Sequence, residues 1–410
     1  MRIKKCRICN ASKEHIIDVL DYKRVALAGN LLKKNQLKAE KKYPLKLVLC
    51  KKCKHLQINF LPKQDLMFKK YLWETGVSSH NISLITKLSN TIQHKKTITQ
   101  KTKIIEIASN DGSLLKVFSK KFKCEVLGVD PAKNFSNKLK DKKINQITDY
   151  FSHKLSKNIN HKHGLFDVCI ARNVIAHLKN PNDIFRGVKN LLAKDGLFII
   201  EVPHLLNIFK YYQYDNVFHE HVGFHSLKSI NDLSKLHGLH LFDVEEIDSQ
   251  GGSIRCYISN SKKTVKSNVK KILDREMRSK LFRKQSWLKF AKDVNNHNLK
   301  LKELLVGLKS KGNRISVYGA SGKGQSLLQF LELKNDFFDH IFDKSKIKQN
   351  LYSPGTHIKI MDPKFISKTK PNYILVCSWN IINEIAKEQK KYLINGGKFI
   401  TPFPEPLIIS

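Results

Sequence analysis

The chain has 410 residues and a formal charge of +40, from 75 Lys and Arg against 35 Asp and Glu. This length predicts two to four domains at roughly 100–200 residues each, and a composition of 41% hydrophobic and 9% aromatic residues excludes a disordered or fibrous chain. No apolar run approaches the ~18 residues of a membrane span and the first residues lack a signal-peptide core, so we expect a soluble, cytoplasmic protein.

The positive charge comes mostly from lysines that are spread evenly along the chain. Nucleic-acid-binding proteins gather basic residues in an arm or interleave them with aromatic ones, and neither pattern occurs here. The even spread therefore favours a solvated surface, and nucleic acid is not an expected partner. A positive surface would still attract a phosphorylated substrate.

Two matching cysteine pairs mark residues 1–65. Cys6 and Cys9 form the first CxxC pair, and Cys50 and Cys53 form the second. Two such pairs can place four thiolates tetrahedrally around one Zn²⁺, whereas a redox CxxC pair would open a helix after a strand. Four cysteine ligands leave no open position, so we predict a structural zinc module, with a Lys-rich connector at residues 31–43.

Residues 66–100 have apolar side chains at helical spacing, and residues 103–260 alternate short apolar strands with helices. That alternation predicts a mostly parallel sheet covered on both faces. The expected strands are Lys103–Ile107, Glu125–Val129, Asp167–Ile170, Leu197–Val202, Leu239–Ile247 and Ser253–Ser259.

A charged helical stretch follows at residues 261–311, and a second α/β unit begins near residue 312. Its expected strands are Arg314–Tyr318, His340–Phe342, Tyr373–Val376 and Lys398–Thr401. The turn Gly319–Gly324 joins the first of them to a helix expected at Gln325–Leu331. This turn could hold a phosphate on its backbone N–H groups or be a plain tight turn, and Asp343 after the next strand could contact a ribose or be an exposed cap.

The turn after the first strand of the central sheet is the best candidate for a ligand site. Small residues at 108, 109 and 112 let a ligand approach the backbone, and Asp130 ends the second strand where a carboxylate can bind a ribose hydroxyl. Asp149 and its neighbours could flank an adenine. Because the turn lacks the pattern GxGxxG, it favours an adenosyl ligand without a pyrophosphate over a dinucleotide.

The segment Glu106–Leu115 resembles the S-adenosylmethionine motif of the sugar C-methyltransferase family, and other family segments follow it in collinear order over the whole chain. They are Ala171–Leu178, Glu201–Pro203, Phe218–His221, Gly251–Arg255, Tyr318–Gly324, Ser353–Ile358 and Ser378–Asn380. Family members build 3-C-methyl deoxysugars from nucleotide-linked 4-keto sugars. The resemblance implies an α/β protein in four parts: a zinc module at 1–65, a class I methyltransferase-like αβα domain at 66–260, a helical connector at 261–311, and a Rossmann-like αβα substrate domain at 312–410.

The resemblance also implies roles for individual residues. His221 is expected to be the base that forms an enolate, His177 a substrate or enolate contact, and Glu220 the carboxylate that orients the base. The expected cofactor-binding residues are Glu106, Ala108, Asn110, Gly112, Asp130, Asp149 and Asn173. The expected substrate-binding residues are Trp73, Phe218, Arg255 and Lys323, the last as a phosphate partner.

Phe218 departs from the family pattern, because it stands where the family has a tyrosine and has no hydroxyl group to donate. Either Tyr214, His219 or Asn173 supplies the missing donor, or the substrate differs. His219 and His221 could also form a metal site, although two imidazoles without a third ligand are a weak signal.

Two other functions remain open from the residues alone. An RNA methyltransferase would explain the zinc module and the charge, but not the second α/β unit or His221. A non-catalytic scaffold would explain the modules, but not the full set of pocket residues. Neither the nucleotide, the sugar, the methylated carbon nor the oligomeric state follows from the sequence.

Overall fold

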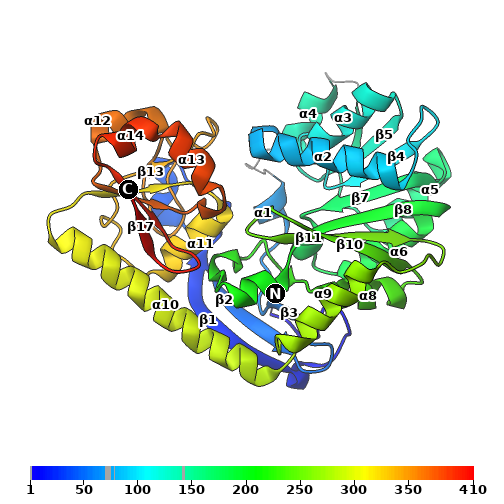
Figure 1. The fold of residues 1–410 in the computed structure, drawn as a ribbon, viewed down its shortest axis with the longest axis horizontal. Helices are drawn as coiled ribbons and strands as arrows, with labels where there is room; N and C mark the ends of the chain where they lie inside the picture. The colour runs from blue at the N-terminus through cyan, green and yellow to red at the C-terminus, as the bar shows by residue number, and fades with distance from the viewer. Residues whose placement is uncertain (1, 70–74, 78, 141–143) are drawn as a thin grey trace.

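The computed structural model describes residues 2–69, 75–77, 79–140 and 144–410. Three sheets organise the chain: an N-terminal sheet, a seven-stranded sheet in a central unit and a six-stranded sheet in a C-terminal unit. Figure 1 shows the central and C-terminal units side by side, with the N-terminal strands passing beneath both. The chain is therefore an α/β protein, as the sequence predicts, and its N-terminal module is built on a β sheet that the sequence did not indicate.

The N-terminal sheet is antiparallel, in the order β1-β2-β3-β9. Its strands are β1 (Ile16–Ala26), β2 (Lys42–Cys50), β3 (Leu56–Ile58) and β9 (Gly223–Phe224). The predicted Lys-rich connector contains a short 3-10 helix, Lys34–Ala39, and the start of β2. The strand β9 joins this sheet from the other half of the chain, directly after His221, so the zinc module supports the segment that carries the expected base.

The central sheet has the strand order β10-β11-β8-β7-β4-β5-β6, in which β11 alone is antiparallel to its neighbours. The strands are β4 (Lys103–Ile107), β5 (Glu125–Val129), β6 (Asn145–Ile147), β7 (Phe166–Arg172), β8 (Leu192–Pro203), β10 (His240–Ile247) and β11 (Ser253–Ser259). The six predicted strands are all present. The sequence did not indicate β6, which has three residues and none of them buried.

Helices cover both faces of this sheet. On one face, α2 (Ser79–Lys95), α3 (Ser113–Phe122) and α4 (Lys133–Lys140) contribute to an apolar cluster that includes Leu88, Leu114 and Leu139. On the other, α5 (His153–His163), α6 (Pro181–Leu191) and α8 (Leu227–Leu236) contribute Ile159, Phe185 and Leu233. Two covered faces explain why the central strands are apolar along their whole length.

The C-terminal sheet has the order β14-β13-β12-β15-β16-β17, and only β17 is antiparallel. Its strands are β12 (Ile315–Tyr318), β13 (Ile341–Phe342), β14 (Ile360–Met361), β15 (Tyr373–Val376), β16 (Lys398–Thr401) and β17 (Leu407–Ile409). Its helices are α11 (Gly322–Phe330), α12 (Ile366–Thr369), α13 (Ile382–Glu388) and α14 (Lys390–Ile394). The short strands β14 and β17 were not predicted, and α11 starts three residues before its expected position.

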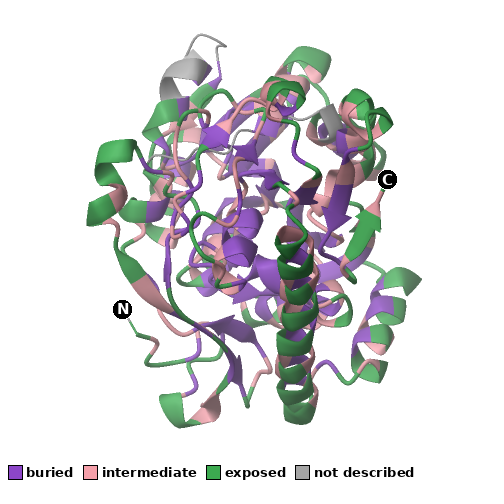
Figure 2. Cartoon of the chain, turned by 90° about the vertical axis from the view of Figure 1, so that its left-hand side faces the viewer, coloured by how far each residue is buried: buried purple, intermediate pink, exposed green. Residues whose placement is uncertain are grey.

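The predicted helical connector folds as α9 (Ser267–Arg278) and the long helix α10 (Lys284–Ser310). One face of α10 buries Trp287, Phe290 and Leu301 in an apolar cluster shared with the N-terminal sheet and the C-terminal unit. Two short helices, α1 (Asp65–Phe68) and α7 (Leu205–Lys210), add Met67 and Leu206 to the same cluster. Figure 2 shows buried residues concentrated in the strands and exposed ones on the outer sides of the helices. Within the described ranges, no helix has the length and apolar character needed to cross a bilayer.

Candidate active site and zinc centre

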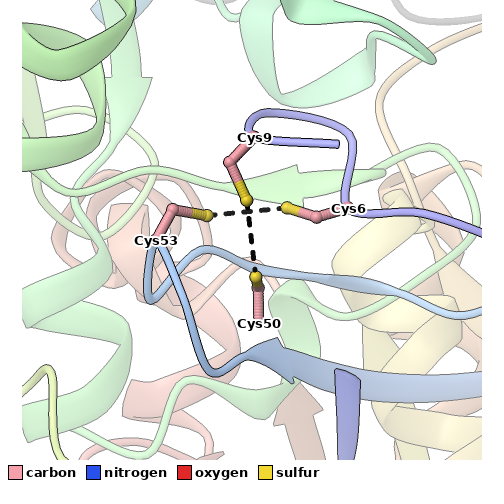
Figure 3. Close-up of side chains that lie close together, drawn as sticks. All are labelled: Cys6, Cys9, Cys50 and Cys53. Atoms are coloured by element: carbon pink, nitrogen blue, oxygen red, sulfur yellow. Dashed lines mark hydrogen bonds between the residues drawn. The ribbon is translucent and has the colours of Figure 1, made fainter. Parts of the chain in front are cut away.

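The four cysteines of the two CxxC pairs converge on one point, as Figure 3 shows. Their Sγ atoms all lie within 4.8 Å of one another, with 3.5 Å between Cys6 and Cys53 and 3.7 Å between Cys9 and Cys50. Tetrahedral zinc with bonds of about 2.3 Å separates its sulfur ligands by about 3.8 Å. The spacing and the all-sulfur donor set therefore fit a structural Zn²⁺ held by Cys6, Cys9, Cys50 and Cys53.

The two cysteine pairs have the same backbone conformation. In each, the residue after the second cysteine has a positive φ angle, 55° at Asn10 and 61° at Lys54, and its N–H donates to the carbonyl of the first cysteine. The side chain of Gln57 approaches the Cys6 sulfur at 3.5 Å. The hydrogen bond from the Cys53 thiol lowers the pKa of Cys6 to about 5, so one thiolate is stabilised even before the other thiols lose their protons to bind a cation.

The turn between β4 and α3 has three residues with positive φ: Ala108 at 58°, Asn110 at 52° and Gly112 at 67°. Left-handed conformations turn the backbone sharply at the end of β4, where the N–H groups of Ala108 and Ser109 donate to the carbonyl oxygen of Val129. On the neighbouring strand, a Cβ at Gly128 would lie 2.6 Å from Ser109 Oγ, so only glycine lets the turn pack there. The structure thus places the expected small residues in a compact turn at the carboxyl end of the sheet.

Asp130 directly follows β5, and its buried carboxylate holds this turn. Its two oxygens accept hydrogen bonds from the backbone N–H groups of Asn110 and Ala132, each at 2.8 Å. Burial raises the pKa of Asp130, and the two N–H donors oppose that shift. Asp149 lies nearby along the chain but is exposed, and it accepts a hydrogen bond from the N–H of Tyr150.

Glu106 is buried in β4 and paired with Arg172, whose Nε and Nη2 lie 3.1 and 2.9 Å from Glu106 Oε1. Burial raises the pKa of Glu106 to about 7 against the opposing effect of Arg172. Its second oxygen, Oε2, is buried without a hydrogen-bond partner among the described residues. Asn173 follows Arg172 and has a φ angle of 52°. Its Oδ1 is also buried without a hydrogen-bond partner among the described residues. Unpaired buried polar atoms are costly, so both side chains are suited to a polar ligand.

His221 and His177 lie edge to face, with 5.1 Å between their ring centroids. His221 Nδ1 is 2.7 Å from the carbonyl oxygen of Asn216. A carbonyl only accepts, so Nδ1 carries the proton and Nε2 keeps its lone pair. Burial lowers the pKa of His177 to about 4 and that of His221 well below its usual range, with His177 adding to the second shift. Both imidazoles are therefore neutral at pH 7.

Glu220 does not orient His221 by a hydrogen bond, contrary to the expectation from the sequence. Its Oε1 accepts from the N–H of Gly29, 2.8 Å away in the N-terminal module, while Oε2 is buried without a partner among the described residues. Burial raises the pKa of Glu220. The ring of His221 is oriented instead by the backbone carbonyl of Asn216, which no side-chain motif could indicate.

His219 and His221 belong to a turn and point to different neighbours. His219 Nε2 lies 3.1 Å from the carbonyl oxygen of Pro44, away from the Asn216 contact of His221. Among the described residues, the four cysteines are the one cluster of three or more potential metal ligands. The histidine pair therefore gives no metal site in this part of the chain.

Phe218 packs its ring against His221, with 4.0 Å between centroids, and a Cβ at Gly322 of α11 would lie 2.9 Å from the Phe218 ring. Two of the three donors considered for the missing tyrosine hydroxyl are engaged elsewhere. Tyr214 Oη lies in the core, 3.3 Å from His297 Nδ1, and His219 contacts Pro44. Asn173 is left as the candidate donor.

Lys323, expected as a phosphate partner, is buried in the first turn of α11. Its Nζ donates to the carbonyl oxygen of Gln250 and lies 5.6 Å from the centre of the Trp379 ring. Burial lowers the pKa of Lys323, and the carboxylate of Asp215 opposes that shift. Lys323 is therefore a buried charge beside the His221 segment rather than a surface cation.

The turn before α11 has Gly319 at φ 99° and is capped by Ser321, whose side chain accepts from the N–H of Gly324. Asp343 joins this turn: its Oδ2 accepts from the N–H of Ala320 at 2.8 Å and from Lys348 Nζ at 3.2 Å. Asp343 is thus a partner of the turn rather than an exposed cap.

Arg255 does not reach into an open site as expected. It is buried in β11, where its Nε donates to Glu201 Oε1 at 2.6 Å and its Nη1 lies 3.4 Å from Glu245 Oε2. Adjacent strands place these charges opposite one another, since Glu201 and Glu245 both pair in register with Arg255. This corrects the predicted substrate contact to an ion pair between strands. Trp73, the other expected substrate residue, lies outside the described residues.

Three domain families match the chain in succession. Residues 6–68 match a zinc binding domain, residues 76–244 a methyltransferase domain, and residues 248–404 the C-methyltransferase C-terminal domain. The C-methyltransferase NovU of Streptomyces niveus is 31% identical over 411 residues, which cover 100% of this chain and 97% of that protein.

Solved structures of other methyltransferases are similar to part of the chain. Magnesium protoporphyrin IX methyltransferase of Synechocystis PCC 6803 with bound S-adenosylmethionine is 11% identical, over 44% of this chain and 79% of that chain, with a TM-score of 0.34. The N-methyltransferase NodS of Bradyrhizobium japonicum WM9 with S-adenosylhomocysteine is 12% identical, over 46% of this chain and 92% of that chain, with a TM-score of 0.36.

Proposed function

Because the chain belongs to the sugar C-methyltransferase family and is an S-adenosylmethionine-dependent C-methyltransferase, we propose that its acceptor is a nucleotide-linked 4-keto-deoxysugar methylated at C3. The observation that carries this proposal is the geometry of His221. A buried imidazole with its proton fixed on Nδ1 presents a lone pair on Nε2, which is what removal of a proton from carbon requires.

In the proposed reaction, His221 Nε2 takes the C3 proton, which the neighbouring 4-keto group acidifies. The electrons of the C3–H bond form the enolate, with the negative charge on the C4 oxygen. The enolate carbon would bond to the methyl group of S-adenosylmethionine as the S–CH3 bond breaks and its electrons stay on sulfur, which leaves S-adenosylhomocysteine, and the carbonyl at C4 would re-form. The imidazolium of His221 returns its proton to solvent to complete the cycle.

The low pKa of His221 has two consequences for this step. It keeps the base neutral at all pH values near 7, but it also makes the isolated imidazole a weak base. A developing enolate beside the ring would favour the imidazolium, because an adjacent negative charge raises the pKa of a histidine. The proton transfer is thus favoured once the keto sugar is in place.

Donors around His221 can stabilise the enolate oxygen. The ring of His177 meets His221 at its edge, and Asn173 begins the loop that leads to His177. The buried charge of Lys323 acts on His221 and would favour an anion there. We assign enolate contacts to His177 and Asn173, and we place the ring of Phe218 against the sugar. Glu220, with one unpaired oxygen, is suited to accept a hydrogen bond from a sugar hydroxyl.

S-adenosylmethionine supplies the electrophilic methyl group when bound. We propose that the turn of Ala108, Asn110 and Gly112 holds it, with the carboxylates of Glu106, Asp130 and Asp149 nearby. The unpaired Oε2 of Glu106 and the sharp turn beside β4 support this position. The nucleotide diphosphate end of the sugar is assigned to the turn before α11 in the C-terminal unit.

The two other functions suggested by the residues are disfavoured. A non-catalytic scaffold is excluded by membership in an enzyme family. An RNA methyltransferase gives no role to a neutral buried imidazole beside a second α/β unit. It would also require binding that weakens steeply with salt.

The test is proton exchange in D₂O. The protein is incubated with a TDP-4-keto-6-deoxyhexose and S-adenosylhomocysteine, and NMR follows the C3 proton. We expect exchange by the wild type and by His237→Ala, whose half-buried ring contacts Asn182 instead. We expect at least about 100-fold slower exchange by His221→Ala, because a positioned general base contributes on that order.

Equal exchange by the wild type and His221→Ala would contradict the role of His221. Absence of exchange in all three proteins, with S-adenosylhomocysteine bound, would contradict the 4-keto sugar as acceptor. RNA would then be the next substrate to test.

A further inference from the structure

We propose that the C-terminal unit orients the base of the central unit, and that Trp379 and Ser326 are the positioning residues. This inference rests on the proposed role of His221. It concerns the short 3-10 helix Tyr214–Asn216, which provides the carbonyl that holds His221 Nδ1. Because this carbonyl sets the tautomer, whatever fixes it in place also fixes the direction of the Nε2 lone pair.

The residue before Asn216 is held by the C-terminal unit. Trp379 Nε1 donates to Asp215 Oδ2 at 2.8 Å, and Asp215 Oδ1 accepts from Asn216 Nδ2 at 3.2 Å. Asp215 is fully enclosed, and burial raises its pKa while the charge of Lys323 and the Trp379 N–H oppose that shift. The Asp215 carboxylate therefore links an indole of the C-terminal unit to the side chain of Asn216.

The residue after Asn216 is held by the same unit. Ser326 of α11 donates from Oγ to the carbonyl oxygen of Val217 at 2.6 Å. Ser326 and Val217 are separated by 109 residues, and Asp215 and Trp379 by 164. Donors from the C-terminal unit thus act on both sides of the one peptide that orients the base.

Packing reinforces this arrangement. A Cβ at Gly251, which has φ 86°, would lie 2.5 Å from Cη2 of Trp379 and 3.2 Å from Nε2 of Gln213, so the turn before β11 packs closely against both side chains. The carbonyl of Gly251 accepts from Gln213 Nε2 at 2.8 Å, which ties the same turn to the start of the Tyr214–Asn216 helix. The indole is therefore confined by the central unit while it donates to Asp215.

The chemical consequence is a dependence of proton removal on contact between the two units. If the Trp379 and Ser326 donors are absent, the Asn216 carbonyl gains freedom and His221 can adopt the other tautomer, in which Nε2 carries the proton. That tautomer cannot accept a proton at Nε2. The C-terminal unit would then contribute to the chemical step as well as to substrate binding.

The experiment uses Trp379→Phe, which keeps the ring and removes the N–H, and Ser326→Ala. Matched controls are Trp287→Phe, whose Nε1 donates to the Leu281 carbonyl at 2.8 Å, and Ser234→Ala, whose Oγ donates to the Ile230 carbonyl at 2.8 Å. All four variants lose one hydrogen bond, which is partly buried for Trp379 and buried for the other three, but only the first two lose a bond next to Asn216.

The first measurement is the ¹⁵N chemical shifts of the His221 ring in the full-length protein labelled with ¹⁵N-histidine, assigned through His221→Gln. We expect the Nδ1–H tautomer in the wild type and both controls, and a mixture of tautomers in Trp379→Phe and Ser326→Ala. The second is kcat for methyl transfer, expected to fall about 10- to 100-fold in these two variants with an unchanged KM for S-adenosylmethionine.

Identical ring shifts and kcat in Trp379→Phe, Ser326→Ala and their controls would overturn the proposal. A tautomer change in these variants without any C3 exchange by the wild type would support the positioning role and count against the proposed function. Ser326→Ala keeps the test decisive if Trp379→Phe does not fold.

Discussion

The contacts of Asn216 and Glu220 show that the tertiary structure decides which residue pairs with His221. Both are close to His221 in sequence, and the carboxylate of Glu220 is the chemically obvious partner for an imidazole. The structure pairs His221 with the Asn216 carbonyl at 2.7 Å and gives Glu220 the N–H of Gly29 at 2.8 Å. A carbonyl partner fixes the tautomer of His221 without adding a negative charge beside the ring.

The buried histidines predict a dependence of stability on pH. Burial lowers the pKa of His177, His219 and His225 to about 4 each, against about 6.5 in an unfolded chain. Between these values the unfolded state binds more protons, so stability falls as the pH falls from 6.5 towards 4 and is fully present above 6.5. We expect a loss of about 2 kcal/mol for each histidine at pH 5.

Urea unfolding at pH 7.5 and pH 5.0 measures this loss. His219→Gln keeps a donor for the Pro44 carbonyl but removes one titrating imidazole. In this variant, the free energy of unfolding should differ less between pH 7.5 and pH 5.0, by about the contribution of one histidine. An unchanged difference would show that His219 does not titrate in this range.

At the scale of single elements, turns carry most of the specific chemistry. The two cysteine knuckles, the Ala108–Gly112 turn and the Gly251–Gly252 turn all contain residues with positive φ. Such turns are defined by local sequence, which is why the knuckles and the turn after β4 could be placed before the structure was known. The residues that pack against these turns could not be predicted, because the local sequence of a turn does not indicate its tertiary contacts.

Gly251→Ala tests one of these turns against a control with the same backbone conformation. Gly251 has φ 86° and Gly396 has φ 85°, so alanine costs about 1–2 kcal/mol of strain at either position. The new Cβ would meet Trp379 only at position 251, since nothing lies within 4 Å at 396. We expect similar losses of stability from strain, but at least a ~10-fold lower kcat for Gly251→Ala alone.

Thermal unfolding and steady-state kinetics separate the two effects. Equal activity of Gly251→Ala and Gly396→Ala would show that the contact with Trp379 does not matter for catalysis.

For the whole molecule, one apolar cluster joins the three units. It contains Leu47 of β2, Tyr214, Leu301 of α10 and Leu327 of α11, together with residues from β12 to β16 of the C-terminal sheet. A second cluster, which includes Ile85, Phe118 and Ile199, lies within the central unit and has no member from residues 1–65. The zinc ligands Cys6 and Cys50 belong to a third cluster, with Leu127 of β5 and Phe185 of α6, on the other face of the central sheet. A disturbance of the zinc module should therefore reach that face and the C-terminal unit more readily than the α2–α3 face.

Removal of zinc tests this connection. Cys50→Ser should lose the metal and lower the melting temperature by on the order of 10 °C, because structural zinc contributes several kcal/mol. Cys124→Ser is the matched control, a buried thiol outside the zinc centre whose Sγ lies 3.7 Å from the Phe118 carbonyl. Metal analysis should find one zinc per chain in the wild type and in this control.

Hydrogen–deuterium exchange then locates the effect. We expect faster exchange in β2, α6 and α11 of Cys50→Ser, with α3 unchanged. Uniformly faster exchange would contradict the separation of the α2–α3 cluster from the other two.

The sequence by itself determined the parts of this protein that depend on local pattern. The CxxC spacing predicted the zinc ligands, the alternation of apolar strands and helices predicted both α/β units, and ten of the strands were placed to within a few residues. The collinear motifs identified the family. These features follow from the spacing of hydrophobic residues and from turn-forming residues, and both depend only on residues that are close together in the sequence.

Only the tertiary structure decided how the site is assembled. Arg255 lies in an ion pair with Glu201, Lys323 is buried against Gln250, and Trp379 reaches Asp215 from 164 residues away. The N-terminal sheet also completes itself with β9 from the segment that bears His221. Each of these contacts satisfies a buried polar group or a strand edge, and the partner is set by which surfaces meet when the three units pack together.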